Sequence, residues 1–497
     1  MSGTSGGDRA PVCIQMLVRE EKVKGDPPME QRKLTRRQML RVLVAGSGAA
    51  ALAACGAQAP ATGPAPTTAP GGGEAQAPTT APATAAPTVV SQTGSTVNIT
   101  YWGSFSGGLG EAEQAMVQRF NEAQNEVKVE YQFQGSYEET AQKFTAALQA
   151  NVIPDVILLS DVWWFGFYVA GAIAELDGLA QQAAVDFADY EPVLLNEGVR
   201  QGKHFWIPFA RSTPLFYYNK QLWAEAGLPD RAPETWAEFS EWAPKLVVKE
   251  GDKLTRAAFL HPNGASYIAW LFQGVTWQHG GQYSLPDFTM TMTDANTVRA
   301  AQFYQDTAGK LGWATLVQEL NKDFIGGVGA AMLASTGGLA GITRDAPFKV
   351  GVGFLPRETS FGCCTGGAGL AIPSGTPDEK KLAAMKYIAF ATNPEQAGIW
   401  SRSTGYMPVR ISTKQSPEMQ AFFTENPNFK TAVEQLPLTR AQDAARVFVR
   451  NGDQIIGKGL ERIIVNGEAP ATVFADVNQE LSTAAAPILE DLKAVEG

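Results

Sequence analysis

Histidine is scarce in this chain: there are three among 497 residues, His204, His261 and His279, and none lies at a spacing typical of metal ligands. The chain beyond residue 55 also lacks the His-Glu-x-x-His, Gly-x-Ser-x-Gly and phosphate-loop patterns. Two Gly-x-Gly pairs near 327 and 351 lack the third glycine of a dinucleotide fingerprint. These absences argue against common enzyme classes, and we expect no cofactor, no metal and no catalytic residue. His204 and His279 are interpreted as hydrogen-bonded structural residues.

Clusters of positive charge are also missing. Lysine and arginine total 40 against 50 acidic residues, the formal net charge is −10, and no long basic run follows residue 41. A nucleic-acid groove or a broad contact with anionic lipid needs such a cluster. The sequence therefore indicates that the partner of the folded part is not a polyanion.

The N-terminal region carries export signals. Residues 35–41 read TRRQMLR and place paired arginines directly before the apolar run 42–54, as in a twin-arginine signal. That run has about 13 residues, fewer than the roughly 20 that span a bilayer. It ends in LAAC, which resembles a bacterial lipobox with Cys55 as the lipid attachment point. We expect 1–54 to be an N-terminal extension and signal, with the mature protein exported and lipid-anchored at the outer face of the cell membrane. The alternative is an uncleaved anchor or a buried apolar helix.

Residues 55–95 contain almost no large apolar side chains. They consist mainly of Ala, Pro, Thr and Gly, so they cannot bury enough surface to offset the entropy of ordering. We predict a disordered linker with an r.m.s. reach of roughly 35 Å.

From residue 97 onward, short β-branched or aromatic runs alternate with amphipathic stretches. This alternation is typical of an α/β fold with buried parallel strands. Ligands of open sheets bind beyond the carboxyl ends of the strands, which here are the loops 103–108, 134–137 and 160–168. The predicted βαβαβ unit comprises strands at 97–102, 127–133 and 155–159 and helices at 112–123 and 138–150.

Polar and aromatic residues follow these predicted strands. The loops contain Tyr137, and Asp161 with Trp163, Trp164 and Tyr168. Hydroxyl groups of a ligand need paired donors and acceptors, and the apolar face of a sugar or polyol stacks on a ring. The sequence favours a polar, hydroxylated ligand here, although the tryptophan pair fits an ordinary hydrophobic core as well.

The stretch 206–220 reads WIPFARSTPLFYYNK and resembles a segment of the extracellular solute-binding proteins, the family that includes the maltose-binding protein. The motif PETWAEF at 233–239 resembles the family's turn into a helix, with Thr235 as N-cap and Glu238 in the place of the capping-box acid. Later matching segments lie at 330–339, 365–370 and 403–409. Together they are most similar to the glycerol-3-phosphate-binding branch.

The resemblance implies an α/β fold of the two-lobed type II periplasmic-binding-protein class, with the ligand in an interlobe cleft. One lobe would comprise 96–209 and 327–372, and the other 210–326 and 373–497. The implied function is that of the substrate-binding lipoprotein of an ABC importer. Its partners would be a small sugar or glycerol-phosphate ligand and the permease subunits, with no nucleic acid, and the protein would be a monomer.

Ligand contacts carried over from the resemblance come from both lobes. Asp161 stands where the branch has a glutamate, Ser212 lies at the hinge, and the glycines would leave backbone N–H groups exposed for an anionic or hydroxyl oxygen. The set is Tyr137, Asp161, Trp163, Ser212, Trp270 (or Trp277), Ser335, Thr336, Gly337, Gly367, Tyr406 and Arg446.

Two chemistries of the ligand stay open. A glycerol phosphate or its diester would be held by Arg446 and the glycine loops, whereas a neutral saccharide would use Asp161 as a bidentate acceptor and the tryptophans as stacking faces. A secreted glycoside hydrolase, with Asp161 as one of two carboxylates, and a ligand sensor for a membrane receptor are the alternative functions. Adjacent Cys363 and Cys364 form either a strained ring disulfide facing the ligand or two free thiols.

Overall fold

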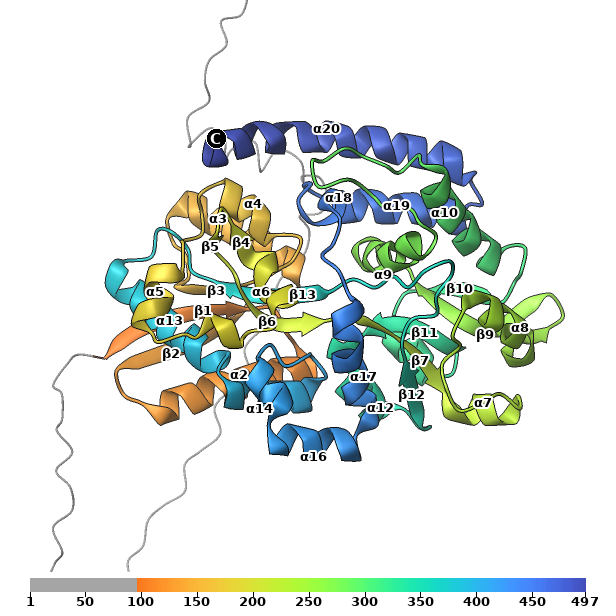
Figure 1. Cartoon of the computed structure of the whole chain (residues 1–497), viewed down its shortest axis with the longest axis horizontal. Coiled ribbons are helices and arrows are strands. Elements are labelled where there is room, and N and C mark those ends of the chain that lie inside the picture. Colours follow the sequence, from red (N-terminus) through yellow and green to blue (C-terminus); the bar gives the residue numbers. More distant parts are fainter. Residues whose placement is uncertain (1–95) are drawn as a thin grey trace, which may run out of the picture. The chain divides into compact units, whose positions relative to one another are not determined.

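The computed structural model describes residues 96–497, so the predicted signal, Cys55 and the linker lie outside the described residues. Two separate β-sheets, each with helices on its faces, form the left and right halves of the molecule in Figure 1. This two-lobed α/β architecture confirms the predicted fold class. None of the helices within 96–497 combines the length and apolar composition needed to cross a bilayer.

The first sheet contains the predicted βαβαβ unit. Strand β1 (Val97–Gly103) pairs in parallel with β2 (Val127–Phe133) and β3 (Val156–Ser160). Strand β13 (Gly366–Ala371) runs antiparallel between β3 and β6 (Ile207–Ser212), giving the order β2-β1-β3-β13-β6. All five residues of β3 are buried, as expected for a strand covered on both faces.

The second sheet repeats this plan. Its order is β10-β9-β11-β7-β12, with two parallel pairs beside two antiparallel ones. The strands are β7 (Pro214–Asn219), β9 (Lys253–Pro262), β10 (Ala314–Val317), β11 (Gly329–Ser335) and β12 (Val350–Gly353). Short strands outside the two orders are β4 (Val199–Arg200), β5 (Lys203–His204) and β8 (Val248–Glu250).

Helices flank both sheets. Around the first sheet lie α2 (Gly107–Ala123), α3 (Tyr137–Ala150), α4 (Trp164–Val169), α5 (Asp177–Gln182), α6 (Pro192–Leu195), α13 (Asp378–Ala391) and α14 (Pro394–Thr404). Around the second lie α7 (Lys220–Glu225), α8 (Trp236–Leu246), α9 (Ala265–Gln278), α10 (Ala295–Ala308), α11 (Leu320–Ile325), α17 (Pro427–Gln435), α18 (Ala444–Val447), α19 (Gly452–Ile464) and α20 (Pro470–Glu496). The remaining helices are α12 (Leu339–Asp345), α15 (Ile411–Gln415) and α16 (Pro417–Glu425).

Helix starts follow local capping chemistry. The Ser136 hydroxyl accepts a bond from Glu139 N, and the Glu139 carboxylate accepts one from Ser136 N, a complete capping box that begins α3 at Tyr137. Thr235 is the N-cap of α8, as predicted, and accepts from Glu238 N at 3.0 Å. The predicted return bond differs, because the Glu238 carboxylate accepts from Glu234 N instead.

The chain crosses between the sheets three times. Only Thr213 separates β6 from β7, residues 354–365 lead back from β12 to β13, and residues 405–426 lead from α14 to α17 (Figure 1). The lobe boundaries expected from sequence therefore need correction. Residues 329–353 belong to the second sheet, because β11 and β12 both pair with β7, and α13 packs on β1 of the first sheet.

Candidate functional site

Asp161 of the first lobe is contacted by polar side chains of the second lobe. It follows β3 directly, and its backbone N–H donates to Gly367 O at 2.9 Å, which fixes its position at the end of the first sheet. From the second lobe, Gln442 Nε2 donates to its carboxylate, and Arg446 Nη1 lies 3.5 Å from Oδ2. Arg446 also donates to Gln442. Asp161 and Arg446 are 6% and 4% exposed, so this interlobe ion pair is buried.

A second buried ion pair lies beside the first. Arg211, at the end of β6, is fully buried and donates to Glu197 Oε2 at 2.6 Å, while Glu197 Oε1 accepts from Thr365 Oγ1 at 2.5 Å. Burial raises the pKa of Glu197, and the negative charge of Asp161 adds to this increase, whereas Arg211 opposes it. Trp270 of α9 donates its indole N–H to Thr365 O at 2.9 Å and so joins this group.

Aromatic side chains form the third part of the site. Phe105 lies between Tyr137 and Tyr406, at centroid distances of 5.8 and 5.9 Å. The Tyr406 ring packs directly against Gly337, where an added Cβ would come within 2.5 Å of Tyr406 Cζ. Burial, with Asp161 among the smaller contributors, raises the pKa of both tyrosines, to about 12 for Tyr406.

Buried polar atoms without hydrogen-bond partners are concentrated on these residues and their neighbours. Five are N–H groups and three are hydroxyls. Buried donors are normally paired, so the arrangement suits a ligand rich in acceptor oxygens. The atoms are Trp163 Nε1, Arg211 Nε and Nη1, Gln273 Nε2, Arg446 Nε, Tyr137 Oη, Ser160 Oγ and Thr336 Oγ1.

The glycines predicted to offer free N–H groups have other roles. Gly337 N donates to Ser335 Oγ at 3.1 Å, so Ser335 caps the 3-10 turn Thr336–Gly338 instead of presenting that amide. Gly367 has φ of +108°, and an added Cβ would lie 2.1 Å from Ala210 O. Glycine is therefore needed at 367 for the backbone, irrespective of a ligand. Ser212 is buried at the end of β6, opposite Gly366.

The two tryptophans of α9 have different contacts: Trp270 bonds Thr365 of the candidate site, whereas Trp277 bonds Asp443. Trp277 donates its indole N–H to Asp443 and carries the Arg440 guanidinium 3.8 Å above its ring. Trp163 precedes α4 with its indole N–H among the unpartnered donors, whereas Trp164 stacks on Trp206 in the core. The core interpretation therefore holds for Trp164.

Comparisons with known proteins identify the family of this chain. A family profile described as bacterial extracellular solute-binding protein matches residues 115–431. The chain belongs to this family. The sn-glycerol-3-phosphate-binding periplasmic protein UgpB of Escherichia coli K12 is 26% identical over 356 residues, covering 69% of this chain and 81% of the relative.

Two solved structures extend the comparison. UgpB from Mycobacterium tuberculosis, in complex with glycerophosphocholine, has a TM-score of 0.75 and 41% identity, over 79% of this chain and 99% of that one. The cyclic alpha-maltosyl-1,6-maltose binding protein from Arthrobacter globiformis has a TM-score of 0.66 at 22% identity, over 80% of this chain and 100% of that chain, which supports the fold alone.

Several residues that the structure places in the candidate site were missed by the sequence analysis. Arg211 stands inside the quoted motif at 206–220, but only its neighbour Ser212 was chosen. Gln442 lies directly before Asp443, the N-cap of α18, and none of the quoted motifs includes it. Thr365 begins the quoted segment 365–370, but only Gly367 was chosen from it. Glu197 and Gln273 have no motif that marks them, because tertiary structure alone brings them to the candidate site.

The ring-disulfide interpretation of the adjacent cysteines is wrong: both are free thiols and both are buried. Cys363 Sγ lies 2.9 Å from Thr213 Oγ1, whereas Cys364 Sγ donates to Trp270 O at 3.4 Å. Successive residues of an extended segment point to opposite sides, so the two sulfur atoms face different partners.

The histidines of this family member make ordinary structural contacts. His204 Nδ1 lies 2.8 Å from Asp177 Oδ1, His261 Nε2 lies 2.9 Å from Thr307 Oγ1, and His279 Nδ1 lies 2.9 Å from Val275 O. Burial lowers the pKa of His261 to about 3, so it is neutral at physiological pH.

Proposed function

We propose that this protein is the substrate-binding component of an ABC importer and that it holds a glycerol phosphate or glycerophosphodiester between its lobes. The observation that carries the proposal is the set of unpartnered donors on two buried guanidinium groups, Arg211 and Arg446. Phosphate oxygens accept several charge-assisted bonds at once, and the guanidinium fork matches them. Asp161 would accept the glycerol hydroxyls.

The relatives support this choice of ligand. Phosphate-bearing polyols are named for both UgpB proteins, one of which is 41% identical to this chain. Transport fits the arrangement, because the ligand contacts come from two lobes and are complete only when both sides touch the ligand. The ligand would then be handed to the permease subunits.

A neutral saccharide is the second candidate. Asp161 and Glu197 offset the charges of Arg446 and Arg211, so the site as a whole carries no formal excess of positive charge. A sugar site also contains carboxylates that accept hydrogen bonds from adjacent hydroxyls, and aromatic rings beside them, a role that Trp163 and Trp270 could fill.

Calorimetry with purified protein tests the proposal. We expect sn-glycerol 3-phosphate or glycerophosphocholine to bind and to raise the melting temperature, since a ligand held only by the folded state stabilises it. Maltose is the neutral comparison ligand. If only the saccharide binds, the phosphate assignment is wrong. Chromatography of each mixture after incubation should return the ligand unchanged, and a hydrolysis product would instead identify an enzyme.

Export and lipid anchoring form a separate part of the proposal, supported by the sequence alone. Cys55→Ser should release the protein from membranes into the medium, and detergent-phase partition measures this. Unchanged partition of the variant would remove Cys55 as the anchor. We propose a monomer, which light scattering checks.

A further inference from the structure

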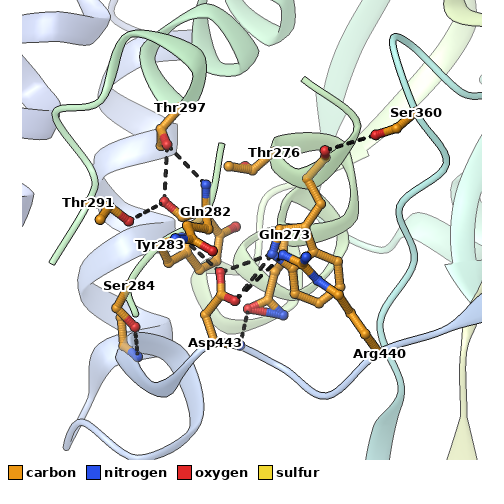
Figure 2. Close-up of polar contacts among 12 residues, drawn as sticks. Gln273, Thr276, Gln282, Tyr283, Ser284, Thr291, Thr297, Ser360, Arg440 and Asp443 are labelled. Carbon is orange, nitrogen blue, oxygen red and sulfur yellow. Dashed lines mark hydrogen bonds and ion pairs between the residues drawn. The ribbon is translucent and has the colours of Figure 1, made fainter. Parts of the chain in front are cut away.

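We propose that Asp443 is a positioning residue that fixes Gln442 and Arg446 for ligand binding. The inference rests on the proposed function, because it concerns the same site. Asp443 lies between these two ligand-site residues in the sequence and is the N-cap of α18. Its own carboxylate contacts Trp277 of α9 and Tyr283 of the loop 281–284, and Figure 2 shows it beside Tyr283.

Contacts of Asp443 attach the segment 440–446 to the second lobe. Its carboxylate accepts from Tyr283 N at 2.8 Å and from the Trp277 indole N–H at 3.1 and 3.2 Å (Figure 2). Its backbone N–H donates to Gln273 Oε1 at 3.0 Å, and its carbonyl accepts from Arg446 N at 3.0 Å. Asp443 therefore holds its segment through both its side chain and its backbone.

Two further contacts restrict the same segment. Ser284 Oγ accepts from Ala445 N at 2.8 Å, and Arg440 stacks on the face of Trp277 (Figure 2). The side chains of Gln442 and Arg446 are thereby presented to the first lobe in a fixed geometry. Pre-organisation of this kind increases affinity, because less freedom is lost when the ligand binds.

Asp443 also gives a pH-dependent readout. Burial raises its pKa to about 6, while the bonds from Tyr283 and Trp277 and the charge of Arg440 oppose the increase. The charged and titratable groups near it are Arg440, Arg446 and Tyr283. A proton on the carboxylate removes an acceptor from this arrangement, so we expect affinity to fall as the pH drops through 6.

The test measures glycerophosphocholine affinity by calorimetry between pH 5 and 8. A phosphodiester is suitable because, unlike a monoester with a second pKa near 6, it does not titrate in this range. We expect Asp443→Ala to bind about 10- to 100-fold more weakly at pH 7.5 and Asp443→Glu to recover part of the loss. The affinity of the wild-type protein for glycerophosphocholine should fall at least threefold from pH 7.5 to 5, whereas the affinity of Asp443→Asn should stay constant over this range.

Asp287 offers a matched control, because it is an exposed aspartate in the neighbouring loop. Asp287→Asn should bind as wild type does. Tighter binding by Asp443→Asn, or by wild type at pH 5, would show that Asp443 acts as a repelling charge and would overturn the proposal. Unchanged affinity in Asp443→Ala would do the same. If wild type binds no glycerophosphodiester, the proposed ligand is wrong, and the same variants are measured with the saccharide that does bind.

A different observation carries a second inference: we infer that the end of α20 is a latch between the lobes. This helix packs on α19 and α10 of the second lobe, and its C-terminal end reaches α4 of the first lobe (Figure 1). There Glu496 accepts two parallel bonds from Arg200, at 2.7 and 2.8 Å. Tyr168 Oη donates to the same carboxylate at 2.9 Å and Gln201 Nε2 at 3.3 Å.

These bonds join the lobes away from Asp161, through one carboxylate. Arg200 and Glu496 are partly buried, and bidentate arginine–carboxylate pairs are the strong form of this contact. A hinge rotation that separates the lobes must break the latch or displace α20 from the second lobe. The latch therefore favours the closed arrangement whether or not ligand is bound, independently of which ligand the site takes.

Small-angle scattering of the ligand-free protein tests the latch. Glu496→Gln should increase the radius of gyration, and the exchange Arg200→Glu with Glu496→Arg should restore it. Glu490→Gln, on the same helix and exposed, is the control. Scattering of Glu496→Gln identical to wild type, with α20 intact by circular dichroism, would overturn the inference. If circular dichroism shows that α20 has unfolded in Glu496→Gln, the test uses the exchange variant instead. A radius of gyration of the exchange variant that stays above the wild-type value would then overturn the inference.

Discussion

Removing the guanidinium of Arg446 tests the phosphate-binding role most directly. In the structure Arg446 is 4% exposed, lies 3.5 Å from Asp161 Oδ2, donates to Gln442 and has an unpartnered Nε. Loss of one partner from a buried charge-assisted contact costs on the order of 2–5 kcal/mol. We therefore expect Arg446→Ala to weaken phosphate binding by about 30-fold to several thousand-fold.

The same variant separates the two ligand chemistries. Asp161 keeps its bond from Gln442 in Arg446→Ala, so a neutral saccharide held by Asp161 should lose much less affinity. Arg446→Lys keeps the positive charge but loses the planar set of N–H donors, so its phosphate affinity should lie between those of wild type and Arg446→Ala. Arg344→Ala removes an exposed arginine and is the control. Calorimetry that shows equal phosphate affinity in Arg446→Ala and wild type would refute the role assigned to Arg446.

Three further predictions concern backbone strain, pH and thiol chemistry. Gly367→Ala should lower the melting temperature and weaken binding, because φ is +108° and Cβ would lie 2.1 Å from Ala210 O; an unchanged melting temperature would contradict this. Burial raises the pKa of Glu113 from 4.5 to about 7, so its contribution to stability is full below pH 4.5 and is lost as the pH rises through 7. Denaturant unfolding should show this loss, up to about 3 kcal/mol, in wild type but not in Glu113→Gln. Cys363 and Cys364 should react with a thiol reagent only after denaturation, because both are buried and burial raises the pKa of each; rapid labelling of the folded protein would disagree.

Local chemistry made the first half of the first lobe predictable. Strand β2 has the bounds expected from sequence, and α3 begins within one residue of the expected position, because its capping box is local. Thr235 was found for the same reason. The return bond of Glu238 differs by one residue, since the sequence does not determine which of two adjacent amides its side chain reaches.

Asp161 and Arg446 were predicted from the order of the family motifs, not from local chemistry. Their positions were carried over from a family resemblance, and the structure places them in contact across 285 residues of chain. Sequence spacing could not show that contact, because it depends on how the two lobes face each other. For the same reason Gly337 was given a ligand role, although its amide is already bonded to Ser335.

The resemblance of the motifs around Ser212 and Tyr406 to a known family implied the two lobes. The sequence by itself determined the α/β class and the order of the strands and helices in the first unit. Those features depend on hydrophobic periodicity and capping, which act over a few residues. Only the tertiary structure decided that β11 and β12 join the second sheet, that Arg211 and Glu197 form a buried pair, and that the cysteines stay apart. The strands β11 and β12 pair with β7 more than a hundred positions away, and the burial of Arg211 and Glu197 depends on how distant segments pack around them, so no local pattern contains these features.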